Sequence, residues 1–141
     1  LAKERACGVK LCYNGDIFTP EELSRFRAEF PETECVMLGR GVIANPGLAE
    51  WMETGKNPLD EKRFRDFHED LLNGYREVMS GNRNTLFKMK ELWTYMLTLF
   101  PDSEKEAKKI RKAGSMEAYL AAVEELLGKR MLCPEKGFQG F

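Results

Sequence analysis

The sequence predicts a mainly α-helical protein that begins with a small parallel α/β part. Near the start, a short apolar run, a well-capped helix and a second apolar run follow one another, an order typical of parallel strands joined by a crossover helix. Beyond Pro58, apolar residues recur with the 3.6-residue period of helices as far as Leu127. We therefore expect a βαβα part over residues 1–58 and a helical part over residues 59–141 with a loosely ordered tail.

The first part contains two expected strands, at residues 9–13 (VKLCY) and at residues 35–38 (CVML). The second run is continuously apolar, which predicts a strand that is buried on both faces. Between the strands, Thr19 is expected as the N-cap of a helix and Pro20 as its first residue, and Glu22 completes a capping box. These signals favour a parallel β-strand pair.

Three further helix starts are expected from the same kind of local signal. Asn45 followed by Pro46 predicts a helix after the loop that the second strand leads into. Ser103 with Glu106 predicts a second capping box, and Ser115 predicts the cap of the last helix.

The second part is expected to contain four helices, with breaks at Gly81, Pro101 and Gly114. Two of its apolar stripes consist of Phe64, Phe67, Leu71, Tyr75, Val78 and Met79, and of Leu86, Met89, Trp93, Met96, Leu97 and Phe100. Helices joined by short loops pack antiparallel, so a four-helix bundle is expected. Trp93 and Phe100 are assigned to its core rather than to an RNA-stacking surface.

Composition excludes several classes of function. The net charge is -1, and no apolar run approaches the roughly 20 residues of a membrane-spanning helix. The four cysteines show no C-x-x-C pair, which indicates reduced, buried thiols and a cytoplasmic protein; they are Cys7, Cys12, Cys35 and Cys133. His68 is the single histidine and is expected at the surface or its boundary, so no metal site is predicted.

Two loops are candidates for binding a phosphate group, because each follows a strand of the expected parallel pair. They consist of Asn14, Gly15 and Asp16, and of Gly39, Arg40 and Gly41. Glycines allow a phosphate to approach backbone amides, a following helix dipole favours an anion, and the guanidinium can bind phosphate oxygens. The alternative is that both loops are only tight turns.

A basic segment is the second candidate site. From residue 83 to residue 112 the chain has eight Lys or Arg residues and four acidic residues, so this segment carries +4 and the rest of the chain -5. The candidate RNA-binding residues are Arg83, Lys88, Lys90, Lys105, Lys108, Lys109 and Lys112. The last four follow i, i+3, i+4, i+7 spacing and share one helix face, as expected for contact with RNA phosphates. The alternative is a solvated face with Glu104 and Glu106 as partners.

Three segments, YNGDI, VMLGRGVIANPGL and KMKELWTYMLTLFP, resemble the C-terminal part of tRNA-dihydrouridine synthases. That family combines a flavin-dependent (β/α)₈ TIM barrel with a helical tRNA-binding domain. The resemblance implies that residues 1–58 are the last two βα units of such a barrel. It implies that the two candidate loops hold the phosphate of FMN, that NADPH or NADH is the reductant, and that tRNA is the partner.

The resemblance also implies what this chain lacks. The family's catalytic cysteine lies upstream, in the missing N-terminal part of the barrel, and Cys133 does not match its position. We therefore expect no catalytic residue here, an inactive chain, and a non-native dimer formed through exposed strand edges. Two alternatives stay open. LGRGVIANPGLAEWMETG also resembles the old yellow enzyme class, although the helical tail favours the synthases, and the chain could be a stand-alone tRNA-binding module.

Overall fold

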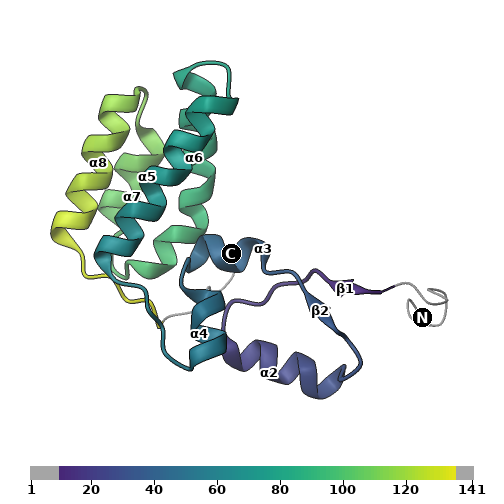
Figure 1. The fold of residues 1–141 in the computed structure, drawn as a ribbon. Helices are drawn as coiled ribbons and strands as arrows, with labels where there is room; N and C mark the ends of the chain where they lie inside the picture. The colour runs from purple at the N-terminus through teal and green to yellow at the C-terminus, as the bar shows by residue number, and fades with distance from the viewer. Residues whose placement is uncertain (1–9, 136–141) are drawn as a thin grey trace.

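The computed structural model describes residues 10–135 and is mainly helical, with one small parallel sheet. Strand β1 (Cys12–Tyr13) pairs with β2 (Cys35–Val36), and Cys12 lies opposite Cys35. Helix α2 (Pro20–Glu29) connects the two strands (Figure 1). The predicted order of strand, helix and parallel strand is therefore confirmed.

The predicted capping box of α2 is also confirmed. Thr19 Oγ1 accepts a hydrogen bond from the Glu22 amide at 3.2 Å, and Glu22 Oε2 accepts one from the Thr19 amide at 3.2 Å. Glu22 Oε2 in addition accepts from the Phe18 amide at 2.7 Å. The start of α2 is thus closed by its own side chains, which satisfy amides that would otherwise lack partners.

The expectation of a second strand buried on both faces is wrong for this chain. Cys35 is exposed, and Met37 is 52% exposed. Phe26 of α2 stacks on Tyr13 of β1, so the contact with α2 covers β1 but leaves these β2 residues open. Cys12 is exposed as well and Cys133 is half-buried, so the prediction of buried thiols fails for these residues. Cys7 lies outside the described residues.

Two short helices follow β2, and their boundaries differ from the prediction. Helix α3 (Gly39–Ala44) begins where a loop was expected, and α4 (Leu48–Thr54) begins after Gly47. Asn45 does not cap a helix as predicted. Its Oδ1 instead accepts from the Gly47 amide at 2.9 Å, a local turn between α3 and α4 that competes with helix capping.

The helical part consists of four longer helices and one short 3₁₀ turn (Figure 1). They are α5 (Glu61–Val78), α6 (Asn82–Met96), η1 (Leu97–Leu99), α7 (Glu104–Lys112) and α8 (Met116–Lys129). Helix α5 packs on α6, α7 packs on α8, and α6 also contacts α8. Helix α3 packs against α6 and η1 and thereby joins the α/β part to the bundle. Within residues 10–135, no helix has the length and apolarity needed to cross a membrane.

The core confirms the predicted α6 stripe and confirms the α5 stripe in part. The α6 stripe is buried at Leu86, Met89, Trp93, Met96 and Phe100. In α5 the buried residues are Phe64, His68 and Leu72, whereas Val78 is 77% exposed. Of the predicted α5 residues, Phe64 is buried, and Phe67, Leu71 and Tyr75 are partly buried against the core. The predicted stripe is therefore confirmed in part: its Val78 end is exposed, and His68 and Leu72 belong to the buried face in addition.

His68 is buried, which contradicts its predicted place at the surface. Trp93 Nε1 donates to the Tyr119 hydroxyl at 2.7 Å, and that hydroxyl lies 2.6 Å from His68 Nε2. With His68 Nε2 unprotonated, the Tyr119 hydroxyl donates its proton to that nitrogen while its oxygen accepts from Trp93. Burial lowers the pKa of His68 to about 4, which fits this neutral state. The two hydrogen bonds of the Tyr119 hydroxyl therefore link α5, α6 and α8.

The predicted capping box at Ser103 and Glu106 is absent. Ser103 Oγ donates to the Phe100 carbonyl oxygen at 2.6 Å, and Glu106 Oε2 accepts from Arg130 Nη2 at 2.9 Å. Glu106 is only 4% exposed, and its own backbone amide in the first turn of α7 together with Arg130 lowers the pKa of its carboxyl. The Ser115 cap is confirmed by a 3.2 Å bond from the Ala118 amide.

Residues 131–135 form no helix or strand, but hydrogen bonds attach this part of the tail to the rest of the chain. The Cys133 amide donates to the Leu99 carbonyl oxygen at 2.7 Å. The Pro134 carbonyl oxygen accepts from Asn45 Nδ2 at 3.2 Å and from Asn57 Nδ2 at 2.9 Å. This segment thus connects the end of the bundle to the α/β part. Residues 136–141 lie outside the described residues.

Candidate functional site

The two candidate phosphate loops lie next to each other, because their strands are parallel neighbours. Asp16 follows β1 and Arg40 lies at the start of α3 after β2, and their carboxylate and guanidinium form an ion pair. Both side chains remain about half exposed, at 53% for Asp16 and 51% for Arg40. The carboxylate of Asp16 is therefore directed at Arg40, and an anion at this edge would compete with it for the guanidinium.

The start of α3 is the more open part of this edge. Its N-cap, Leu38, makes no side-chain hydrogen bond to the helix, so the first amides of α3 have no side-chain cap. A Cβ atom placed on Gly39 would meet no atom within 4 Å, so the space beside this residue is free. The start of α3 thus combines amides without a side-chain cap with the guanidinium of Arg40, an arrangement that favours an anion.

The other glycines of the two loops are surrounded by the protein itself. The Tyr13 side chain lies against Gly15, beside the exposed Asn14. A Cβ atom on Gly41 would overlap the Ile17 carbonyl oxygen and come within 2.8 Å of Leu48 Cδ2. The lack of a side chain at Gly41 is thus required by packing between the loop after β1 and helix α3.

The four predicted lysines of α7 line one groove of about 710 Å³ between α7 and α8. They are Lys105, Lys108, Lys109 and Lys112, and all are exposed. Alanines of α8 form the opposite wall; they are Ala118, Ala121 and Ala122. We call this feature the lysine groove. Small apolar side chains at its wall leave room for a polyanion to approach the ammonium groups.

Within residues 10–135, only one lysine of the groove pairs with an acidic side chain. Lys109 Nζ lies 2.6 Å from Glu125, which also contacts Lys129, and these two cations lower the pKa of Glu125 to about 2. Among residues 10–135, no carboxylate forms an ion pair with Lys105, Lys108 or Lys112. The alternative partners considered from the sequence do not fill this role, since Glu106 binds Arg130 and Glu104 forms no ion pair within the described chain.

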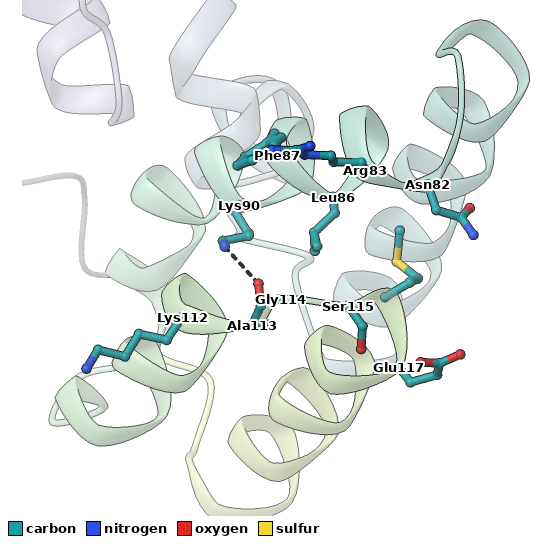
Figure 2. Close-up of a pocket in the computed structure, with 11 residues that line it drawn as sticks. Asn82, Arg83, Leu86, Phe87, Lys90, Lys112, Ala113, Gly114, Ser115 and Glu117 are labelled. Atoms are coloured by element: carbon teal, nitrogen blue, oxygen red, sulfur yellow. Dashed lines mark hydrogen bonds between the residues drawn. The ribbon is translucent and has the colours of Figure 1, made fainter.

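A second hollow of about 630 Å³ lies beside the lysine groove, between the start of α6 and the α7–α8 connection (Figure 2). Arg83 and Lys90 line it, and Lys90 Nζ donates to the Ala113 carbonyl oxygen at 2.9 Å. Lys112 lines both the hollow and the groove, so the two form one continuous basic surface. Lys88 does not line either and instead pairs with Glu91 at 2.9 Å.

Sequence reasoning missed Phe87, an aromatic residue in this surface. It lines the hollow, and its side chain is 56% exposed. The signal was present, because Phe87 lies outside the buried stripe of α6 and has Arg83 four residues before it and Lys90 three residues after it. Among the described residues, no group of three or more metal-ligating side chains is present.

Comparison with known proteins gives one informative similarity. No family model matches the chain. The chain is 22% identical over 119 residues to the tRNA-dihydrouridine(16) synthase of Shewanella oneidensis strain MR-1. The alignment covers 83% of this chain and 36% of that enzyme, so the chain spans about a third of the length of this curated relative. The similarity supports, at the level of the family, the resemblance seen in the sequence motifs.

Proposed function

We propose that this chain is the C-terminal part of a tRNA-dihydrouridine synthase. Residues 1–58 would complete a flavin-binding (β/α)₈ barrel, and residues 59–141 would form its tRNA-binding domain. The proposal is supported by the similarity to the Shewanella enzyme and by the parallel strand–helix–strand unit at the start of the chain. The lysine groove is the observation that carries it furthest, since it provides a site for a polyanion on a chain of net charge -1.

The groove is suited to the backbone of a folded RNA. Lys105, Lys108 and Lys112 present three ammonium groups along one side of α7, free of acidic partners among residues 10–135. Each phosphate that they neutralise releases counterions, which makes binding favourable at low salt and weaker as salt rises. Arg83 and Lys90 extend the same surface across the second hollow. The negative charge of the chain then lies elsewhere and disfavours other orientations of the RNA.

For the flavin, we propose contacts of this chain with the phosphate group of FMN alone. Gly39 and the guanidinium of Arg40 would hold the phosphate at the start of α3, and Asp16 would give up its ion pair with Arg40 to admit it. When bound, FMN reduced by NADPH or NADH supplies the hydride for reduction of a uridine ring. No residue of this chain is assigned a catalytic role, because the alignment spans only 36% of the related enzyme.

The proposed RNA binding is tested by measuring the affinity of the purified chain for a tRNA transcript over a range of salt concentrations. We compare the wild type with the triple variant Lys105→Ala, Lys108→Ala, Lys112→Ala. The plot of log K against log salt has a negative slope, and each lost phosphate contact should make it shallower by roughly 0.7–0.9. The triple variant should therefore bind more weakly, and its slope should be shallower by up to about 2–3.

The matched control removes the same charge from other surfaces. In the variant Lys10→Ala, Lys56→Ala, Lys62→Ala, the three lysines lie in the α/β part, in the linker and at the start of α5, outside both hollows. Its affinity for tRNA should stay within about twofold of the wild type. Equal losses in the two triple variants would show non-specific attraction and would contradict the proposed interface.

A further inference from the structure

We propose that Phe87 and its flanking cations form a stacking site for an unpaired base of the bound RNA. The inference rests on the proposed function, because it assumes that the basic surface contacts RNA. It goes further by assigning to one part of that surface the recognition of a base rather than of the phosphate backbone. The site consists of the Phe87 ring, Arg83, Lys90 and the second hollow beside them.

The position of Phe87 on α6 is unusual for an aromatic side chain. The buried stripe of the same helix includes Leu86 and Met89, which lie on either side of it in the sequence. Phe87 points away from that stripe and remains 56% exposed. Core packing therefore does not account for the exposed position of the ring.

Two cations are held against this ring. The Arg83 guanidinium carbon lies 5.7 Å from the ring centroid, and Lys90 Nζ lies 5.9 Å from it. Both cations lie over the ring, at distances near the outer limit of cation–π contact. A base that stacks on Phe87 would displace a cation from the ring face. Figure 2 shows Arg83 beside Phe87 and Lys90 directed to the Ala113 carbonyl oxygen. The Ala113 bond fixes one of the two cations in place.

The combination indicates a nucleic acid as the ligand. An aromatic face gains free energy by stacking on a base, and adjacent Arg or Lys side chains bind the phosphates on either side of that base. Lys112 places a further cation at the far side of the hollow, where it joins the lysine groove. Glu117 is the acidic residue among those lining the hollow, and it lies at the start of α8. Backbone binding in the groove would thus lead a strand past Phe87.

A stacked base must be unpaired, which sets a clear distinction between RNA ligands. Bases in a continuous A-form helix are already stacked on their neighbours and offer no free face. Loops of a folded tRNA contain bases that can leave the stack. The site should therefore add to the affinity for tRNA and should add nothing for a continuous RNA duplex.

The test compares Phe87→Leu with the matched variant Phe30→Leu, in binding to a tRNA transcript and to a blunt RNA duplex of similar length. Phe30 is also an exposed aromatic residue, 49% exposed, but it caps the C-terminal end of α2 and lies outside both hollows. Phe87→Leu should weaken tRNA binding at least about fivefold with an unchanged salt slope, because stacking is lost and no phosphate contact is removed. Duplex binding, and both affinities of Phe30→Leu, should stay within about twofold.

A second readout does not depend on affinity. Irradiation of the wild-type complex with ultraviolet light should crosslink the peptide that contains Phe87 to a nucleotide of the tRNA, as detected by mass spectrometry. Equal tRNA affinities for Phe87→Leu and wild type, or equal losses for tRNA and duplex, would overturn the stacking site while the lysine-dependent binding stands. Absence of any salt-dependent tRNA binding by the wild type would overturn the proposed function and the stacking site together.

Discussion

At the scale of single residues, the most consequential group is the buried contact between His68, Tyr119 and Trp93. One hydroxyl accepts from the indole at 2.7 Å and is left with its single proton for the imidazole at 2.6 Å. The three side chains come from α5, α8 and α6, so the pair of bonds holds three helices together. Because the imidazole must stay neutral to accept that proton, the fold should be sensitive to acid.

The first prediction concerns this pH dependence. A pKa lowered from 6.5 to about 4 means that the unfolded chain binds a proton at His68 before the folded chain does. The stability that neutral His68 provides is complete above pH 6.5, declines as the pH falls, and is lost below pH 4, for a total of about 3 kcal/mol.

Urea unfolding between pH 7.5 and pH 5 measures this effect. His68→Gln should be less stable than the wild type at pH 7 but should show little change in its free energy of unfolding over this range, since the chain has no other histidine. A wild-type stability that is also constant between pH 7 and pH 5 would contradict the neutral, buried state of His68.

Residues whose role depends on distant partners were the ones that sequence reasoning misplaced. His68 was expected at the surface because its partner, Tyr119, is 51 positions away in the sequence. Glu106 was expected in a capping box because Ser103 is near, but it binds Arg130, which is 24 positions away. Thr19 and Glu22 were predicted correctly, since their hydrogen bonds join residues three positions apart. Local hydrogen bonding is encoded in neighbouring residues, whereas burial is decided by the whole fold.

At the scale of elements, α3 depends on a close approach to the loop after β1. A Cβ atom on Gly41 would overlap the Ile17 carbonyl oxygen, whereas one on Gly39, in the same short helix, would meet nothing within 4 Å. The two glycines thus differ in their surroundings and share the same change in helix propensity when replaced by alanine. Comparing alanine substitutions at the two positions therefore separates the effect of close packing from the effect of helix propensity.

The second prediction uses that pair. Gly41→Ala should lower the free energy of unfolding by about 1–3 kcal/mol, because α3 must move away from Ile17. Gly39→Ala should leave stability within about 0.5 kcal/mol of the wild type or raise it slightly. Chemical denaturation followed by far-UV circular dichroism measures both. Equal effects of the two substitutions would refute the close approach of α3 to the β1 loop.

The third prediction concerns the segment 131–135, which ties the α/β part to the bundle. Asn57 Nδ2 donates to the Pro134 carbonyl oxygen at 2.9 Å, and Asn57 Oδ1 accepts from the Leu59 amide at 3.1 Å. Asn57→Ala removes both bonds and should cost about 1–3 kcal/mol. The control Asn73→Ala removes an amide from the exposed side of α5 and should cost less than about 0.5 kcal/mol.

Thermal unfolding and limited proteolysis at the tail measure this effect. Faster cleavage near Pro134 in Asn57→Ala, without faster cleavage in Asn73→Ala, is the expected result. A tail that is cut equally fast in both variants and in the wild type would show that these hydrogen bonds do not hold it.

Elements with strong local signals were predictable, and their packing was not. The α6 stripe from Leu86 to Phe100 was predicted from its period and is buried as expected. In α5 the predicted residues from Phe64 to Tyr75 pack on the core, but the exposed end at Val78 and the burial of Leu72 were not predicted, because they depend on where the neighbouring helices lie. The β2 strand was expected in a buried sheet, and its exposure reflects the small number of strands present among residues 10–135.

At the scale of the whole molecule, a net charge of -1 conceals a separation of charge. The helical spacing of the α7 lysines predicted that they share a face. The groove itself could not be predicted, since its second wall of alanines is supplied by α8. Likewise, the parallel pairing predicted that the two phosphate loops share an edge, but the ion pair between Asp16 and Arg40 became visible only in the structure. The proposed function therefore depends on surfaces assembled from several elements.

The most direct test of the central claim is the dihydrouridine content of tRNA in cells of the source organism, with and without the gene that encodes this chain. Mass spectrometry of digested tRNA locates each dihydrouridine in the sequence. The account predicts that loss of the gene abolishes dihydrouridine at one or a few defined positions, and that the intact gene restores it. Unchanged dihydrouridine at every position would contradict the synthase and, if the purified chain still binds tRNA through its lysine groove, would leave a stand-alone tRNA-binding module.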